Sequence, residues 1–206
     1  MSEINSILIA LAETSSEVAA LATLVSVEGS SYRRPGARLL VLSGGRRVGS
    51  ISGGCLEDDI ILRANRVLKN GRPEIVTYDT TGENDIVWGV GLGCRGVVSI
   101  FIEPIPVGRP GWISALAENQ AARRNTRLIV AFDEAFAERR ATYVEDDAPQ
   151  VTGVARVFEQ LIVPPPSLIL FGAGDDAQPV VRLAHEVGWH VTVVDSRAAY
   201  ATAERF

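Results

Sequence analysis

The C-terminal part of the chain holds the feature that most constrains its fold, an apolar run followed at once by two closely spaced glycines. Leu168–Phe171 is typical of a buried strand, and Gly172 and Gly174 follow it at the start of a helical pattern. Gly188 ends this helix, and a second apolar run leads to Asp195. A strand, a helix and a second strand in this order predict a parallel βαβ unit.

The glycines and the aspartate of this unit occupy the positions used in dinucleotide-binding folds. Gly172 would form the tight turn, Gly174 would let a pyrophosphate approach the backbone, and Asp195 would bind ribose hydroxyls. The alternative is a βαβ unit that keeps its glycines for packing and binds no ligand. The two aspartates at 175–176 favour that alternative, because carboxylates at a helix N-terminus repel a pyrophosphate placed there.

The same unit is shorter than a complete dinucleotide-binding domain. Such a domain needs two mononucleotide-binding halves, whereas this sequence ends at Phe206, soon after the second strand. Two parallel strands alone leave unpaired edges and an uncovered apolar face. Either the remaining strands of a longer domain are absent from this sequence, or this truncated Rossmann-like unit docks on another chain. We expect homodimerisation or strand exchange.

Upstream of this unit, periodic apolar segments predict a mixed α+β domain. Helical spacing appears in Ile4–Glu13, in Leu56–Lys69 and in Trp112–Arg124, and β-rich runs separate these segments. Residues 133–150 carry many charges and few periodic apolar positions, which indicates irregular or peripheral structure. The predicted fold class is α/β, with a mixed α+β domain at 1–162, a proline-rich linker at 163–167 and a Rossmann-like βαβ domain at 168–206.

Composition narrows the range of partners. The chain has 206 residues, 47% of them hydrophobic, and a formal net charge of −5. A net negative charge does not favour nucleic acid or an anionic membrane, and the apolar runs are shorter than the ~18 residues that span a bilayer. We expect a cytoplasmic protein whose partners are small molecules or proteins. Its two cysteines are then free thiols, because a reducing compartment disfavours disulfides.

One of these cysteines lies in the sequence SISGGCLEDD, at the expected start of a helix. Free N–H groups and the positive end of the helix dipole point into such a loop, so Ser52, Gly53 and Gly54 are predicted to hold an anion beside an activated Cys55 thiol. The negative charges of the acids at 57–59 oppose binding of an anion and activation of the thiol. These acids are expected to cap the helix and face solvent. The alternative is a capped helix after a β-hairpin, with a half-buried cysteine.

The second thiol has a similar setting. Gly93 and Cys94 lie in GVGLGCRG, a glycine-rich stretch that favours ligand wrapping, with an irregular turn as the alternative. Arg33, in the loop SSYRRPG, is a further candidate for contacting an anion, with a solvated basic turn as the alternative. We hypothesise that Cys55 and Cys94 converge on one pocket. No zinc-binding spacing and no hydrolase motif occurs, so no metal ligand and no firm catalytic residue is assigned.

Together these motifs resemble the XdhC/CoxI family of accessory proteins for xanthine dehydrogenase and carbon monoxide dehydrogenase. The ordered set covers nearly the whole chain and is more specific than any one motif. It consists of EGSSYRRPGA at 28–37, GSISGGCLE at 49–57, GLGCRG at 91–96, FGAG at 171–174 and VDSR at 194–197.

The resemblance implies a cytosolic chaperone that binds molybdenum cofactor, favours its sulfuration with a cysteine desulfurase as partner, and delivers it to a molybdenum hydroxylase. It also implies an N-terminal domain with both cysteines and a C-terminal Rossmann-like domain. Such an accessory factor needs no turnover of its own. Two other functions remain open, an NAD(P)-dependent oxidoreductase using Gly172, Gly174 and Asp195, and a thiol redox protein using Cys55 and Cys94.

Overall fold

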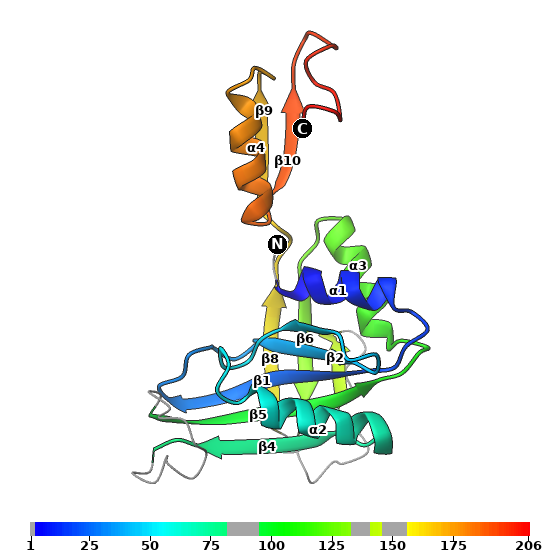
Figure 1. Cartoon of the computed structure of the whole chain (residues 1–206), viewed down its shortest axis with the longest axis vertical. Helices are drawn as coiled ribbons and strands as arrows, with labels where there is room; N and C mark the ends of the chain where they lie inside the picture. The colour runs from blue at the N-terminus through cyan, green and yellow to red at the C-terminus, as the bar shows by residue number, and fades with distance from the viewer. Residues whose placement is uncertain (1–2, 82–94, 133–140, 146–155) are drawn as a thin grey trace.

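A five-stranded antiparallel sheet organises the N-terminal part of the chain (Figure 1). The structure is a computed structural model and describes residues 3–81, 95–132, 141–145 and 156–206. The strand order is β3-β2-β1-β5-β4, and every neighbouring pair is antiparallel. In chain order the strands are β1 (Ala19–Gly29), β2 (Arg38–Leu42), β3 (Arg47–Gly49), β4 (Glu74–Asp79) and β5 (Gly96–Ile105).

The central strand β1 is buried on both faces, which explains its continuous apolar sequence. Ala20, Ala22 and Leu24 belong to the core on one side of the sheet, whereas Ala19 and Leu21 belong to the core on the other side. Because successive side chains of a strand point to opposite faces, a strand between two packed layers must be apolar at nearly every position.

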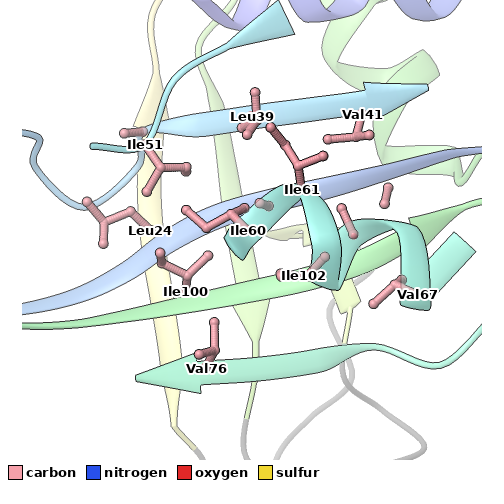
Figure 2. Close-up of a cluster of buried hydrophobic side chains, with 14 of the residues drawn as sticks. Leu24, Leu39, Val41, Ile51, Ile60, Ile61, Val67, Val76, Ile100 and Ile102 are labelled. Atoms are coloured by element: carbon pink, nitrogen blue, oxygen red, sulfur yellow. The ribbon is translucent and has the colours of Figure 1, made fainter. Parts of the chain in front are cut away.

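Helix α2 (Glu57–Asn70) covers one face of this sheet (Figure 2). The predicted helix at Leu56–Lys69 is confirmed, and Gly71 ends it with an N–H that bonds the carbonyl of Val67 at 2.9 Å. Ile60 and Val67 are fully buried against the sheet. Three acids at the start of the helix and one lysine near its end match the helix dipole.

Two helices and a second sheet cover the other face. Helices α1 (Glu3–Glu13) and α3 (Gly111–Ala121) supply apolar side chains to the same core as Leu21 and Leu40. The second sheet is antiparallel, has the order β7-β6-β8, and packs on this side as well. Its strands are β6 (Thr126–Ala131), β7 (Ala141–Val144) and β8 (Val157–Ile162).

The second sheet corrects one prediction. Residues 141–144, expected to be irregular or peripheral, form the edge strand β7 and pair with β6, and β8 was not predicted. Both strands are short, and their polar residues are adjacent in sequence rather than alternating with apolar ones, so they give little periodic signal of their own. Their partner β6 provides the hydrogen-bond ladder, which makes them strands through a long-range contact. The remainder of 133–150 lies outside the described residues.

The C-terminal segment forms the predicted parallel βαβ unit. Strands β9 (Ser167–Phe171) and β10 (His190–Val194) pair in parallel, and α4 (Ala177–Glu186) joins them. In Figure 1 this unit extends away from the two sheets. No helix in the described part of the chain is both long and apolar enough to cross a membrane.

The βαβ unit leaves one apolar face uncovered, and we expect this face to drive self-association. Ile169 is 57% exposed and Phe171 is 84% exposed, on the side of the strands opposite α4. Burying this face is favourable because apolar area leaves water. Sedimentation velocity at low micromolar concentration should therefore show a dimer, and Phe171→Asp should shift it toward monomer. Val107→Asp is the matched control, because Val107 is exposed outside this unit. A sharp monomer peak for the unmodified chain would contradict the expectation.

Candidate functional site

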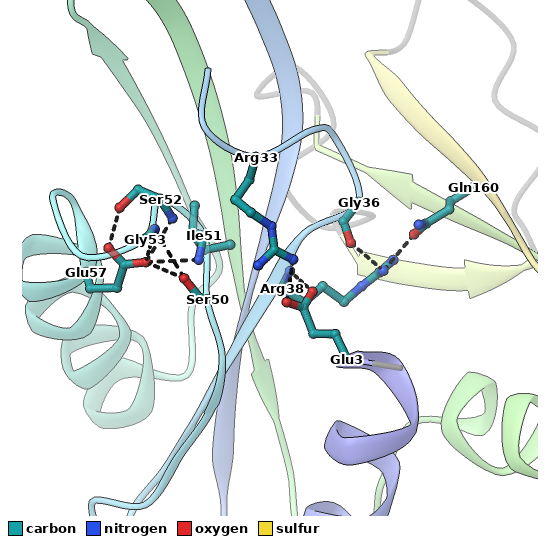
Figure 3. Close-up of polar contacts among 10 residues, drawn as sticks. All are labelled: Glu3, Arg33, Gly36, Arg38, Ser50, Ile51, Ser52, Gly53, Glu57 and Gln160. Carbon is teal, nitrogen blue, oxygen red and sulfur yellow. Dashed lines mark hydrogen bonds and ion pairs between the residues drawn. The ribbon is translucent and has the colours of Figure 1, made fainter. Parts of the chain in front are cut away.

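The loop between β3 and α2 is organised around the carboxylate of Glu57 (Figure 3). Backbone N–H groups from four consecutive residues donate to this carboxylate at 2.8–3.1 Å, and two serine hydroxyls donate as well. The backbone donors are Ile51, Ser52, Gly53 and Gly54, and the hydroxyl donors are Ser50 and Ser52. A set of N–H groups that converge in this way is an anion-binding nest. In this chain the anion bound by the nest is the carboxylate of its own Glu57.

The hydrogen bonds shift the protonation of Glu57. Burial alone would raise the pKa of this carboxyl, but the bonds from Ser52, Ser50 and the loop backbone outweigh burial and lower the pKa from 4.5 to about 2. Glu57 is therefore ionised at physiological pH. The expectation that Glu57 faces solvent as a simple cap is wrong, because its carboxylate turns back into the loop. The N–H groups of Ser52, Gly53 and Gly54, predicted to hold an external anion, donate to Glu57.

Cys55 follows this nest directly. Its side chain is half-buried, and its Sγ lies 3.6 Å from the carbonyl oxygen of Ser52. The thiol is thus partly accessible at the start of α2. Gly93 and Cys94 lie outside the described residues, so convergence of the two thiols stays a prediction.

A second loop, Ser30–Gly36, lies against the first. The ring of Tyr32 packs over Gly53, where a Cβ atom would come within 2.6 Å of Tyr32 Cε1. Gly53 also has φ +77°, a conformation that side chains disfavour. The positive φ therefore favours glycine at position 53, whereas the exposed Tyr32 ring could shift to admit a side chain; the contact brings the two loops together.

Tyr32 and the following residues of the second loop also border a cavity of about 450 Å³. We call it the arginine cavity, because Arg33, Arg34 and Arg38 all line it. Glu3 from α1 and Gln160 from β8 complete its polar wall. One carboxylate oxygen of Glu3 pairs with Arg33 Nη2 at 2.6 Å, and the other accepts the backbone N–H of Arg38 at 2.7 Å (Figure 3).

Arg38 is an unusual wall residue because it is only 2% exposed. Its Nη1 donates to the carbonyl of Gly36 at 2.9 Å and to Gln160 Oε1 at 2.6 Å. Its Nε and Nη2 have no hydrogen-bond partner among the described residues. Burial lowers the pKa of Arg38 to about 10, although the charges of Glu103 and Glu3 oppose this shift. The guanidinium stays charged at neutral pH.

The glycine loop of the βαβ unit is also bonded within the chain. Gly172 has φ +107° and donates its N–H to the carbonyl of Val194 at 2.8 Å, which continues the parallel ladder between β9 and β10. The Asp195 carboxylate accepts the N–H of Ala173 at 2.8 Å and pairs with Arg197, also at 2.8 Å. The hydrogen bonds of Arg197 and Ala173 hold the pKa of Asp195 well below its ordinary value. A ribose hydroxyl would have to compete with these partners.

The two aspartates after this loop are arranged differently. Asp175 pairs with Arg205 at 2.7 Å, which offsets part of the negative charge expected to repel a pyrophosphate. Asp176 makes no side-chain cap bond to α4, and a Cβ on Gly174 would lie 2.5 Å from its Oδ1. Within the described ranges, no cluster of three or more His, Cys, Asp or Glu side chains is arranged to hold a metal ion.

Comparison with known proteins places these loops in a family. The model of the XdhC and CoxI family matches residues 12–79, and the model of the XdhC Rossmann domain matches residues 168–206. The chain is 32% identical to a probable xanthine dehydrogenase subunit of Bacillus subtilis (strain 168), over all of this chain and 68% of the relative. The chain belongs to the XdhC and CoxI family.

Two further proteins are also similar to this chain over part of their own length. The molybdenum cofactor insertion chaperone PaoD of Escherichia coli (strain K12) is 26% identical over 90% of this chain and 55% of its own length. A crystal structure described as a xanthine dehydrogenase from Bacillus halodurans superposes with a TM-score of 0.80 and 30% identity, over all of this chain and 66% of that one. The chain thus spans between about half and two thirds of the length of these relatives.

The XdhC and CoxI match at residues 12–79 includes both loops of the site. The sequence predicted only some of the residues of this site. Arg33 and Cys55 were predicted, but Arg38 and Gln160 were not. A signal for Arg38 exists, because period two places it on the same strand face as the buried Leu40 and Leu42. No comparable local signal exists for Gln160, which reaches the cavity from a strand 122 residues away.

Proposed function

We propose that this chain is a cytoplasmic chaperone that binds molybdenum cofactor and delivers it to a xanthine-dehydrogenase-type molybdenum hydroxylase. In this proposal it also assists sulfuration of the cofactor, with a cysteine desulfurase as the sulfur source. Membership of the XdhC and CoxI family and the likeness to an insertion chaperone support the role. The role requires binding and release of a cargo, and no turnover by the chain.

One observation carries the proposal: Tyr32 contacts Gly53, two residues before the half-buried thiol of Cys55, and Tyr32 also lines a cationic cavity. Molybdenum cofactor combines a pterin, a phosphate and a metal centre with soft ligands. Thiolates suit such a metal, and guanidinium groups suit a phosphate. Cys55 and Arg33 are therefore proposed as cargo-binding residues. Cys94 and Gly93 join them in the proposal, as the second thiol and its glycine.

Cofactor retention tests the proposal directly. Purified anaerobically from cells that make the cofactor, the unmodified chain should retain molybdenum and pterin in equal amounts. Cys55→Ser should lower the affinity by about tenfold or more, since even outer-shell changes at metal sites cost 10–100-fold. Cys94→Ser tests the second thiol in the same way, and Ser43→Ala, at an exposed position outside both loops, is the control. If the unmodified chain retains no cofactor, the proposal is wrong.

An NAD(P)-dependent oxidoreductase is the alternative function. The Rossmann-domain match and the positive φ of Gly172 directly after β9 favour it. In this alternative Gly174 would face the pyrophosphate and Asp195 would exchange Arg197 for ribose hydroxyls. Titration with NADH would decide, because binding should change its fluorescence and Gly172→Val should abolish that change.

A further inference from the structure

The residues that line the arginine cavity carry more positive than negative charge. Three arginines and one glutamate line it. The single carboxylate, Glu3, already pairs with Arg33 and also accepts the Arg38 backbone N–H. Arg34 is exposed and has no side-chain partner among the described residues. Within that part of the chain, two guanidinium charges in the wall are left without a paired carboxylate.

The charge of a second acid, Glu103, also acts on Arg38, but the two side chains form no ion pair among the described residues. Glu103 is 3% exposed and is bonded to Thr142, whose hydroxyl and N–H both donate to it. Burial raises the pKa of Glu103, so its charged form is disfavoured. Buried charges in proteins are normally paired, which makes the buried Arg38 guanidinium, with two nitrogens unpartnered among the described residues, a notable exception.

The neighbouring nest is closed to external anions. Its four N–H donors and two hydroxyls already bond the ionised Glu57 carboxylate. An external anion would have to displace this intramolecular carboxylate, and Glu57 would then lose the bonds that keep its pKa low. The arginine cavity requires no such displacement at Arg34.

From these observations we infer that the arginine cavity, rather than the glycine loop before α2, is the subsite for the phosphate group of a phosphorylated small molecule. Arg34 contacts the phosphate from the solvent side, and Arg33 and Arg38 provide charge from the wall. A cavity of about 450 Å³ is larger than a single phosphate and falls in the size range of small-molecule sites. Assigning that phosphate to molybdenum cofactor rests on the proposed function, whereas the anion subsite itself rests on the cavity.

Calorimetric titration with inorganic phosphate at low ionic strength tests the inference without the cofactor. Arg34→Ala should weaken phosphate binding by about tenfold, the size of one lost charge-assisted hydrogen bond, and Arg34→Lys should restore part of it. Arg72→Ala is the matched control, since it removes the same charge after the end of α2 and does not line the cavity. Equal losses for Arg34→Ala and Arg72→Ala, or no binding at all, would overturn the inference.

A second variant separates the two candidate locations. Glu57→Gln removes the carboxylate charge from the nest and leaves the cavity-lining residues unchanged. Phosphate affinity should stay within about twofold in this variant, because a neutral amide leaves the arginine cavity intact. A large gain in affinity with Glu57→Gln, together with no loss in Arg34→Ala, would place the anion at the nest and contradict the inference.

The source of the phosphate is decided by repeating the titration on protein loaded with molybdenum cofactor. If the cofactor's phosphate fills the cavity, loading should abolish binding of inorganic phosphate. Unchanged phosphate binding after loading would overturn the assignment to the cofactor. A chain that binds phosphate through Arg34 but retains no cofactor would refute the proposed function and leave the anion subsite standing.

Discussion

Replacing Glu57 by alanine should lower the free energy of unfolding by about 2–4 kcal/mol. The substitution removes the acceptor of four backbone N–H groups and two hydroxyls, and the N–H groups of Ile51 and Ser52 then lie in buried residues without a partner. Each buried donor left unsatisfied costs about 1–3 kcal/mol, whereas water can replace the acceptor at the exposed Gly53 and Gly54. Urea denaturation at neutral pH measures the difference.

The effect of Glu57 should also depend on pH in a defined window. Its pKa is lowered from 4.5 to about 2 in the folded chain, so its ionised form stabilises the fold fully above pH 4.5. That contribution is lost as the pH falls through about 2. The difference in the free energy of unfolding between the unmodified chain and Glu57→Gln should therefore shrink as the pH falls from 4.5 to about 2.

Asp58→Ala is the control for Glu57→Ala. Asp58 is the next residue of α2 and is exposed, and its replacement removes one carboxylate from the same helical turn. This loss should change stability by less than about 1 kcal/mol, as expected for a surface charge near a helix N-terminus. Equal destabilisation by the two substitutions would show that the nest contributes nothing beyond the helix dipole.

Ile60→Ala should destabilise the chain by about 3 kcal/mol. Ile60 is fully buried between α2 and the five-stranded sheet, where it belongs to the same core as Leu24 and Ile100 (Figure 2). Truncation removes buried apolar atoms and leaves a cavity, which costs about 2–5 kcal/mol in similar cores. The midpoint of urea unfolding should fall accordingly.

Leu62→Ala offers a matched comparison two residues further along α2. Leu62 is 62% exposed, so its truncation should change stability by no more than about 0.5 kcal/mol. If both substitutions had the same effect, α2 would not be packed on the sheet as the structure shows.

Helix α2 and the βαβ unit follow from local sequence alone. In α2, the helical spacing of Ile60, Ala64 and Val67, the acids before them and Gly71 after them all indicate one helix. In the βαβ unit, Gly172 and Gly188 end the strand and the helix where the structure ends them. Such signals lie within one element, so they can be recognised without knowing its neighbours.

Other features depend on residues far apart in the sequence. Strands β7 and β8 have little apolar periodicity, and they exist as strands because β6 pairs with both. Arg38 is buried because α1 and β8 close over its end of β2, with Gln160 supplying an acceptor. Propensity and pattern carry no information on such pairings, since the energy comes from contacts between segments.

The family and the glycine, serine and cysteine positions of the site were therefore determined by the sequence itself. Only the tertiary structure decided which groups these residues bind. The position of a charged side chain depends on its hydrogen-bond partners and counter-charges, and folding brings those partners together. The N–H groups of the glycine loop, which were predicted to bind an external anion, donate instead to the carboxylate of Glu57, five residues after Ser52. The cationic site then lies in the adjoining cavity, which segments from both sheets and α1 build together.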